Sequence, residues 1–135
     1  MIKVNLSDCE FITKLPKLWV PNLEYLGFSG CKNLVEIDEC FGSLEKLKIW
    51  NLRNCRKLQI LPSQLRLKSL DLFILSGCSS LEKLPNFHPE IERLKALQLE
   101  GSGIREVPSP IEHLTKLEKL RLCGCKNLQI GRAHV

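Results

Sequence analysis

Apolar residues recur along this chain in an order that repeats about every 23 residues. The stretch Leu70–Pro85 shows this order: Phe73 and Leu75 alternate with polar or outward positions, and further apolar residues follow at steps of three up to Leu84. Alternation is typical of a short, half-buried strand, and the steps of three suit a chain that turns back along a narrow core. A strand and return of this length cannot bury their apolar side chains alone, so the pattern predicts similar neighbours on both sides.

Five further copies of the order surround this stretch. Four copies close on an apolar residue and a proline, whereas the second closes on Ile37-Asp38 and the sixth stops before a closing pair. Their agreement in register matches the leucine-rich-repeat pattern L-x-x-L-x-L-x-x-N/C-x-L. A cysteine, or serine in its place, marks each copy at intervals of 22 to 24 residues: Cys9, Cys31, Cys55, Cys78, Ser102 and Cys125.

The pattern predicts an α/β solenoid, a leucine-rich-repeat horseshoe of about six repeats. Each copy would add one strand to a parallel sheet on the concave face, and short irregular, 3-10 or helical segments would form the convex side. We expect the recurring cysteines to be buried and reduced, with the thiol acting as a weak hydrogen-bond donor. We also expect a local bulge at Trp50, where other copies carry a smaller residue. Apolar residues upstream of the strands would line the opposite wall: Val20/Leu23, Leu44/Leu47, Leu67/Leu70, Ile91/Leu94 and Leu114/Leu117.

The repeats predict one domain over residues 1–129, with the sixth copy truncated. Residues 130–135 read Ile-Gly-Arg-Ala-His-Val, which sequencing-adapter DNA encodes when it is read in frame, so we interpret them as a non-native tail. Because no capping element flanks the repeats, we expect a monomeric fragment that is prone to associate through its uncapped ends. No apolar run is long enough to span a membrane and no signal segment precedes the first strand, which favours a cytoplasmic protein without a membrane partner.

Other chemistry finds little support in the sequence. Seven cysteines could suggest disulfides or a metal, but most belong to the repeat, and Cys123-Gly124-Cys125 offers two ligands at most. The net charge of +5 comes without the interleaved aromatic residues of a nucleic-acid surface, so no nucleic-acid partner is expected. The chain has no phosphate-binding loop, no G-x-G-x-x-G motif and no nucleophile beside a histidine. We therefore expect neither enzyme activity nor a cofactor in this chain.

The candidate binding surface consists of the residues that point outward from the predicted strands. Most are polar, as an exposed sheet face requires. Tyr25, Ile49, Leu72 and Ile74 are the exceptions, and the register places them side by side as an exposed apolar patch on the concave face. Such a patch suits a protein partner or, alternatively, a neighbouring domain of a longer parent protein. The polar residues predicted around it are Asn51, Arg53, Gln98 and Arg121.

The repeats N-L-S-D-C-E-F-I-T-K-L-P, L-S-G-C-S-S-L-E-K-L-P and L-C-G-C-K-N-L resemble the C-terminal repeats of plant disease-resistance proteins. More narrowly, they resemble the class with a Toll/interleukin-receptor domain ahead of a nucleotide-binding domain. Cysteine-type repeats of that class alternate with one that carries Gly-Thr before Ile-x-Glu-Leu-Pro, and Gly101 to Pro108 match it with Ser102 in place of threonine.

The resemblance implies an interaction module of an intracellular plant immune receptor. Its repeats would recognise a pathogen effector and restrain the nucleotide-binding switch, in the cytoplasm or, for some of the family, the nucleus. It assigns ADP or ATP binding, and any NAD cleavage, to parent domains absent from this chain. Substrate-recognition repeats of an F-box ubiquitin-ligase receptor are an alternative, although Leu-Pro closes the turn here where those repeats usually carry Ile-Thr-Asp. A generic repeat scaffold is another. Extracellular plant receptors carry paired cysteine caps and Leu-x-Gly-x-Ile-Pro copies, which are missing.

Overall fold

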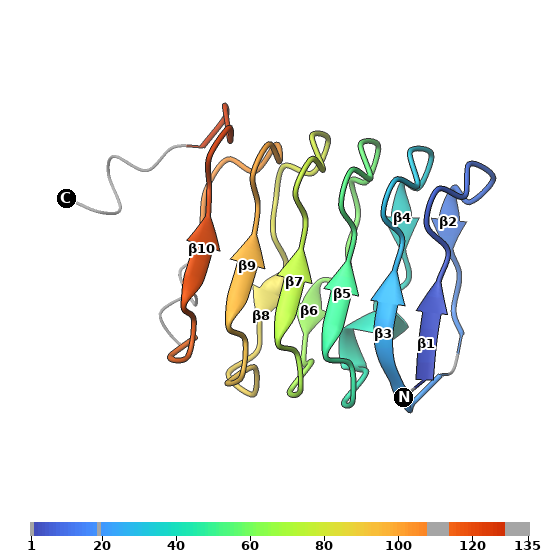
Figure 1. Cartoon of the computed structure of the whole chain (residues 1–135), viewed down its shortest axis with the longest axis vertical. Coiled ribbons are helices and arrows are strands. Elements are labelled where there is room, and N and C mark those ends of the chain that lie inside the picture. Colours follow the sequence, from blue (N-terminus) through green and yellow to red (C-terminus); the bar gives the residue numbers. More distant parts are fainter. Residues whose placement is uncertain (1, 19, 108–113, 129–135) are drawn as a thin grey trace.

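The computed structural model describes residues 2–18, 20–107 and 114–128, which wind into a parallel β-solenoid (Figure 1). Each copy of the repeat contributes one strand to a main sheet, and neighbouring strands are parallel. The predicted solenoid with one strand per copy is confirmed; we call each turn of it a rung. In spatial order the six strands are β1 (Ile2–Asn5), β3 (Leu23–Gly27), β5 (Ile49–Asn51), β7 (Leu72–Ile74), β9 (Ala96–Gln98) and β10 (Lys119–Arg121). Residues 129–135, which include the predicted non-native tail, and Pro108 lie outside the described residues.

Trp50 does not distort the sheet, so the expectation of a bulge is wrong. It pairs in regular register with Leu26 on one side and Phe73 on the other. The large indole is accommodated because the next rung presents a flat ring. The ring centroids of Trp50 and Phe73 are 5.1 Å apart and the rings are inclined by 10°, which is a stacked arrangement. Both side chains are completely buried.

The wall opposite the main sheet consists of short strands (Figure 1). β2 (Lys14–Leu15) pairs with β4 (Glu36–Ile37), and β6 (Gln64–Leu65) pairs with β8 (Asn86–Phe87). The apolar core lies between this wall and the main sheet. The upstream residues that were expected to line it are buried, except that Val20 and Leu117 are partly buried.

The 3-10 helix η1 (Glu39–Ser43) follows the irregular ending Ile37-Asp38 of the second copy. The Asp38 carboxylate accepts a hydrogen bond of 2.9 Å from the backbone N–H of Cys40 and so caps the helix. This hydrogen bond lowers the pKa of the Asp38 carboxyl. The place where proline is replaced by aspartate is therefore the place where the wall turns into a short helix.

The recurring cysteines form a hydrogen-bonded ladder through the core. Four of these thiols, those of Cys31, Cys55, Cys78 and Cys125, donate to a carbonyl oxygen of the preceding rung, at a residue three positions before that rung's own ladder position. All seven cysteines are free, and Cys31, Cys55 and Cys78 are completely buried, as predicted. The prediction of burial is wrong for Cys9 and Cys125, in the first and last rungs, which are only partly buried. The pairs are Cys31 Sγ to Leu6 O at 2.9 Å, Cys55 to Phe28 at 3.0 Å, Cys78 to Leu52 at 3.1 Å and Cys125 to Leu99 at 2.9 Å.

Burial controls the acidity of this ladder. Loss of hydration raises the pKa of the Cys55 thiol from its ordinary value to about 12, and the neighbouring Cys31 raises it further. Burial likewise raises the pKa of Cys78 and of Cys31. Ser102 occupies the same ladder position in the fifth rung and is also buried, with its hydroxyl 3.6 Å from Cys125 Sγ. The ladder position therefore requires a small, buried hydrogen-bonding group that stays neutral.

The residue before each ladder position adopts a positive φ between 60° and 78°, which only glycine, asparagine and aspartate adopt readily. Asp8 and Asn54 occupy this position in the first and third rungs, and glycine occupies it in the other four. The Asp8 side chain occupies the space that a Cβ atom would take at Gly30, and Asn54 does the same at Gly77. An aspartate or asparagine in one rung thus requires glycine in the next.

Candidate protein-interaction surface

The outward-pointing residues of the main sheet form two columns that cross all six strands; we call this surface the open sheet face. The strand pairing places the columns in the register that the sequence predicts. Ser7, Ser29, Arg53, Ser76, Glu100 and Cys123 continue the face just beyond the strands. The first column is Lys3, Tyr25, Ile49, Leu72, Ala96 and Lys119; the second is Asn5, Gly27, Asn51, Ile74, Gln98 and Arg121.

Tyr25, Ile49 and Leu72 form an apolar stripe across β3, β5 and β7, and each side chain is half-buried. The Tyr25 ring leans over Gly27 on its own strand: a Cβ atom at Gly27 would lie 2.7 Å from a ring carbon. Glycine therefore allows the ring to lie against the sheet. The Lys3 ammonium is 5.8 Å from the centroid of this ring, which is within cation–π range.

Ile74 departs from the prediction, because its side chain is only 7% exposed. Arg53 follows β5 and donates through Nη2 to Gln98 Oε1 on β9, at 3.3 Å. Since β7 lies between β5 and β9, these two side chains meet above it, and Ile74 pairs directly with Gln98. The bond accounts for the burial of Ile74. The exposed apolar surface is the stripe of three residues, and Ile74 lies beneath its polar border.

Charge on the open sheet face is strongly unbalanced. Glu100 accepts a hydrogen bond of 2.9 Å from Ser76 Oγ, and its second oxygen is 4.0 Å from Arg121 Nη1. It is the single carboxylate among the residues of this face, which carries four cations. These are Lys3, Arg53, Lys119 and Arg121.

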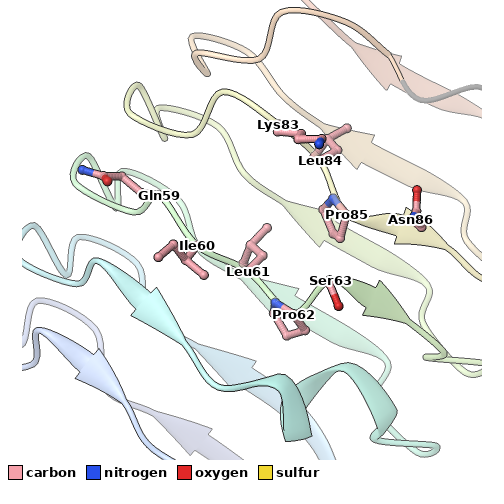
Figure 2. Close-up of a pocket in the computed structure, with 9 residues that line it drawn as sticks. All are labelled: Gln59, Ile60, Leu61, Pro62, Ser63, Lys83, Leu84, Pro85 and Asn86. Carbon is pink, nitrogen blue, oxygen red and sulfur yellow. The ribbon is translucent and has the colours of Figure 1, made fainter.

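A pocket of about 330 Å³ lies on the opposite wall, between residues 59–63 and 83–86 of adjacent rungs (Figure 2). Pro62 and Pro85 stand at corresponding positions there and have no N–H to donate. Within the described chain no backbone hydrogen bond joins residues 59–62 to residues 82–85, and pairing resumes only beyond the prolines. The pocket is thus a gap between rungs. Lys83 is its one ionisable side chain, so it holds no set of groups for catalysis.

The described residues offer no other chemical centre. Nowhere in residues 2–18, 20–107 and 114–128 do three His, Cys, Asp or Glu side chains gather as a metal site requires. No helix in that part of the chain has the length and apolar character needed to cross a bilayer. The surface best suited to a function is therefore the open sheet face.

The structure brings most of the predicted site residues together. Tyr25, Ile49 and Leu72 are neighbours, and Asn51, Arg53 and Gln98 border them, whereas Arg121 lies two strands away from Leu72. Two contributors were missed. Gly27 gives the Tyr25 ring its place, and Glu100 engages Arg121. Both could have been found from the sequence, because each lies among the outward-pointing positions, two residues from a predicted site residue.

Comparison with known proteins identifies the repeat. No protein-family model matches the chain. The chain is 35% identical over 128 residues to the TMV resistance protein N of Nicotiana glutinosa, covering 93% of this chain and 11% of that protein. It is 34% identical over 128 residues to the disease resistance protein RML1A of Arabidopsis thaliana, covering 94% of this chain and 12% of the relative. It is 38% identical over 108 residues to the disease resistance protein RPP2A of Arabidopsis thaliana, covering 80% of this chain and 8% of the relative.

The chain therefore spans about a tenth of the length of these relatives, and the similarity covers most of its six rungs. The relatives belong to the class that joins a Toll/interleukin-receptor domain, a nucleotide-binding domain and leucine-rich repeats. The sequence similarity and the parallel solenoid both indicate a leucine-rich-repeat region. The fold of such a region is not itself catalytic. Over most of its length the chain is thus similar to the leucine-rich-repeat region of plant disease-resistance proteins of this class.

Proposed function

We propose that the open sheet face is the protein-binding surface of a plant immune receptor. In this proposal the face recognises a pathogen effector, and the repeats restrain the nucleotide-binding switch of the receptor until the effector binds. The observation that supports it is the apolar stripe of Tyr25, Ile49 and Leu72, half-exposed in the middle of a polar sheet. Such a patch with a polar border is typical of an interaction site. The similarity to disease-resistance proteins supports the immune role.

The proposal assigns this chain a binding role alone. ADP or ATP binding, and any NAD cleavage, would belong to the other domains of such a receptor, and the receptor would act in the cytoplasm or the nucleus. A protein partner fits the surface better than a small molecule because the stripe is an open sheet face that crosses three strands.

The test is Leu72→Asp in a receptor that carries these repeats, expressed in leaf tissue. A carboxylate in the centre of the stripe would be desolvated by any partner that covers it. We expect the effector-triggered cell-death response to be lost, while the resting receptor accumulates normally and stays silent. Ile60→Asp is the matched control, because Ile60 is also apolar and 49% exposed but lies on the opposite wall. It should leave the response unchanged.

Two other results would contradict the proposal in different ways. Cell death without an effector in Leu72→Asp would show that the open sheet face docks on another domain of the receptor and holds it inactive. A normal response and a silent resting state would show that this face does not carry the function.

A further inference from the structure

The open sheet face carries four cations and a single carboxylate, Glu100. Elsewhere on the surface, several lysines and arginines pair with glutamate of an adjacent rung, as Lys32 does with Glu10 at 2.9 Å and Lys48 with Glu24 at 3.1 Å, and others have no such partner among the described residues. The spacing between rungs therefore allows a carboxylate of one rung to form an ion pair with a cation of the next. On the open sheet face only Arg121 has such a partner, and three cations remain without one among the described residues.

Arg53 is an unpaired cation on the same rung as Ile49, just beyond the end of β5. Its backbone N–H donates to Asn51 Oδ1 at 3.0 Å, which fixes the chain at the end of β5, two residues beyond Asn51 and four beyond Ile49. The corresponding residues of the neighbouring rungs are Ser29 and Ser76, as the backbone bonds of the following turns show. Small side chains on both sides leave the exposed guanidinium accessible.

The present partner of Arg53 is weak. Its Nη2 donates to the neutral amide oxygen of Gln98 at 3.3 Å, which is a long hydrogen bond. A guanidinium has five N–H donors and binds a carboxylate through two parallel hydrogen bonds that are shorter and stronger than this one. A carboxylate from a partner would therefore displace Gln98 at little cost.

We infer that the open sheet face binds a protein segment with an apolar centre and acidic residues around it, and that Arg53 pairs with one of its carboxylates. The inference rests on the proposed function and adds the chemical class of the partner. Tyr25, Ile49 and Leu72 receive the apolar side chains. Arg53 and Lys3, at two borders of the stripe, receive the acidic ones. Arg53 thereby determines specificity rather than the bulk of the affinity, because cations at an interface border mainly select for the opposite charge.

The test uses the purified chain and three fluorescent seven-residue peptides. All three carry leucine and phenylalanine at alternate positions, and the remaining positions are all glutamate, all glutamine or all lysine. We expect fluorescence anisotropy to show the glutamate peptide binding about tenfold more tightly than the glutamine peptide, with the preference falling as salt screens the charges. Arg53→Gln should remove most of this preference. Arg105→Gln, which removes an exposed cation paired with Glu82 away from this face, should leave it unchanged.

Equal binding of the three peptides, no binding by any of them, or preference for the lysine peptide would overturn the inference. So would a preference that Arg53→Gln and Arg105→Gln reduce equally, because it would reflect only net charge. Leu72→Asp should weaken the glutamate and glutamine peptides alike, since it acts on the apolar centre. If the peptides fail to discriminate while Leu72→Asp in the receptor still abolishes the effector response, the acidic partner is excluded and the proposed function stands.

Discussion

Raising the pH from about 7.5 to about 10 is expected to lower the free energy of unfolding by about 2 kcal/mol for each of the thiols of Cys55 and Cys78, whose pKa burial raises most. The combined loss for these two is about 4 kcal/mol at most. Burial also raises the pKa of Cys31, which acts in the same direction. A loss of this size is a large part of the stability of many domains. The solenoid should therefore unfold in mild alkali.

The direction follows from the raised pKa values. In the unfolded chain a cysteine loses its proton near pH 8.5, about the ordinary value. In the folded chain Cys55 keeps its proton up to a pH of about 12, because burial disfavours the thiolate. The stability that these neutral thiols contribute is complete below the unfolded pKa, and it is lost as the pH rises towards the folded pKa. Each thiol lowers the free energy of unfolding by about 1.4 kcal/mol per pH unit within that window.

Urea unfolding followed by circular dichroism at several pH values, in the presence of a reductant, measures this slope. The matched control is the double variant Cys55→Ser, Cys78→Ser, since Ser102 shows that the ladder accepts a hydroxyl and serine does not titrate in this range. All other groups are common to the two proteins and cancel in the comparison. The variant should lose most of the thiol-dependent slope. Parallel curves for the two proteins would show that the buried thiols do not control the alkaline transition.

Trp50→Ala is expected to cost about 3–5 kcal/mol, which makes it the most damaging single substitution we anticipate in the core. Trp50 is completely buried and stacks on Phe73, with the ring centroids 5.1 Å apart. Alanine would leave a cavity in the middle of the solenoid and remove the stacked pair, because the flanking rungs are held by their own strand pairing and cannot collapse into the space.

Trp50→Phe separates the contribution of the stacked aromatic ring to stability from that of the indole N–H. Trp50 Nε1 is buried and has no hydrogen-bond partner, so losing it carries no penalty of a broken bond. Phenylalanine keeps an aromatic ring against Phe73 and leaves a smaller cavity. We expect a cost of about 1–2 kcal/mol, measured by urea unfolding beside Trp50→Ala. Equal costs for the two variants would mean that the stacked ring does not stabilise this rung.

The sequence was sufficient for the register of the main sheet, for a physical reason. In a solenoid each residue type recurs at the same place in every rung, so the alternation of one copy is confirmed by the others. The columns that contain Tyr25 and Asn51 follow from this repetition alone. Features that depend on residues found in only one copy could not be predicted in this way. The helix after Asp38 and the stacking of Trp50 on Phe73 depend on single residues that differ between copies.

The same limit explains the error at Ile74. Its position on the outward column was right, but its exposure depends on whether long side chains of other rungs extend over it. Arg53 and Gln98 meet across an intervening strand, and such a contact between non-adjacent rungs leaves no periodic trace in the sequence. Side chains of neighbouring columns, rather than the backbone register, thus determine which part of the open sheet face is accessible.

Thiol labelling of the native protein tests the rung register most directly, because the cysteines report on both the core and the open sheet face. Mass spectrometry after brief exposure to an alkylating reagent near neutral pH would identify the modified residues. Cys123, which is exposed at the end of the last strand, should react. Cys31, Cys55 and Cys78 should be spared, because they are buried and protonated. Rapid modification of these three in a sample that circular dichroism shows to be folded would contradict the register, and with it the placement of the apolar stripe.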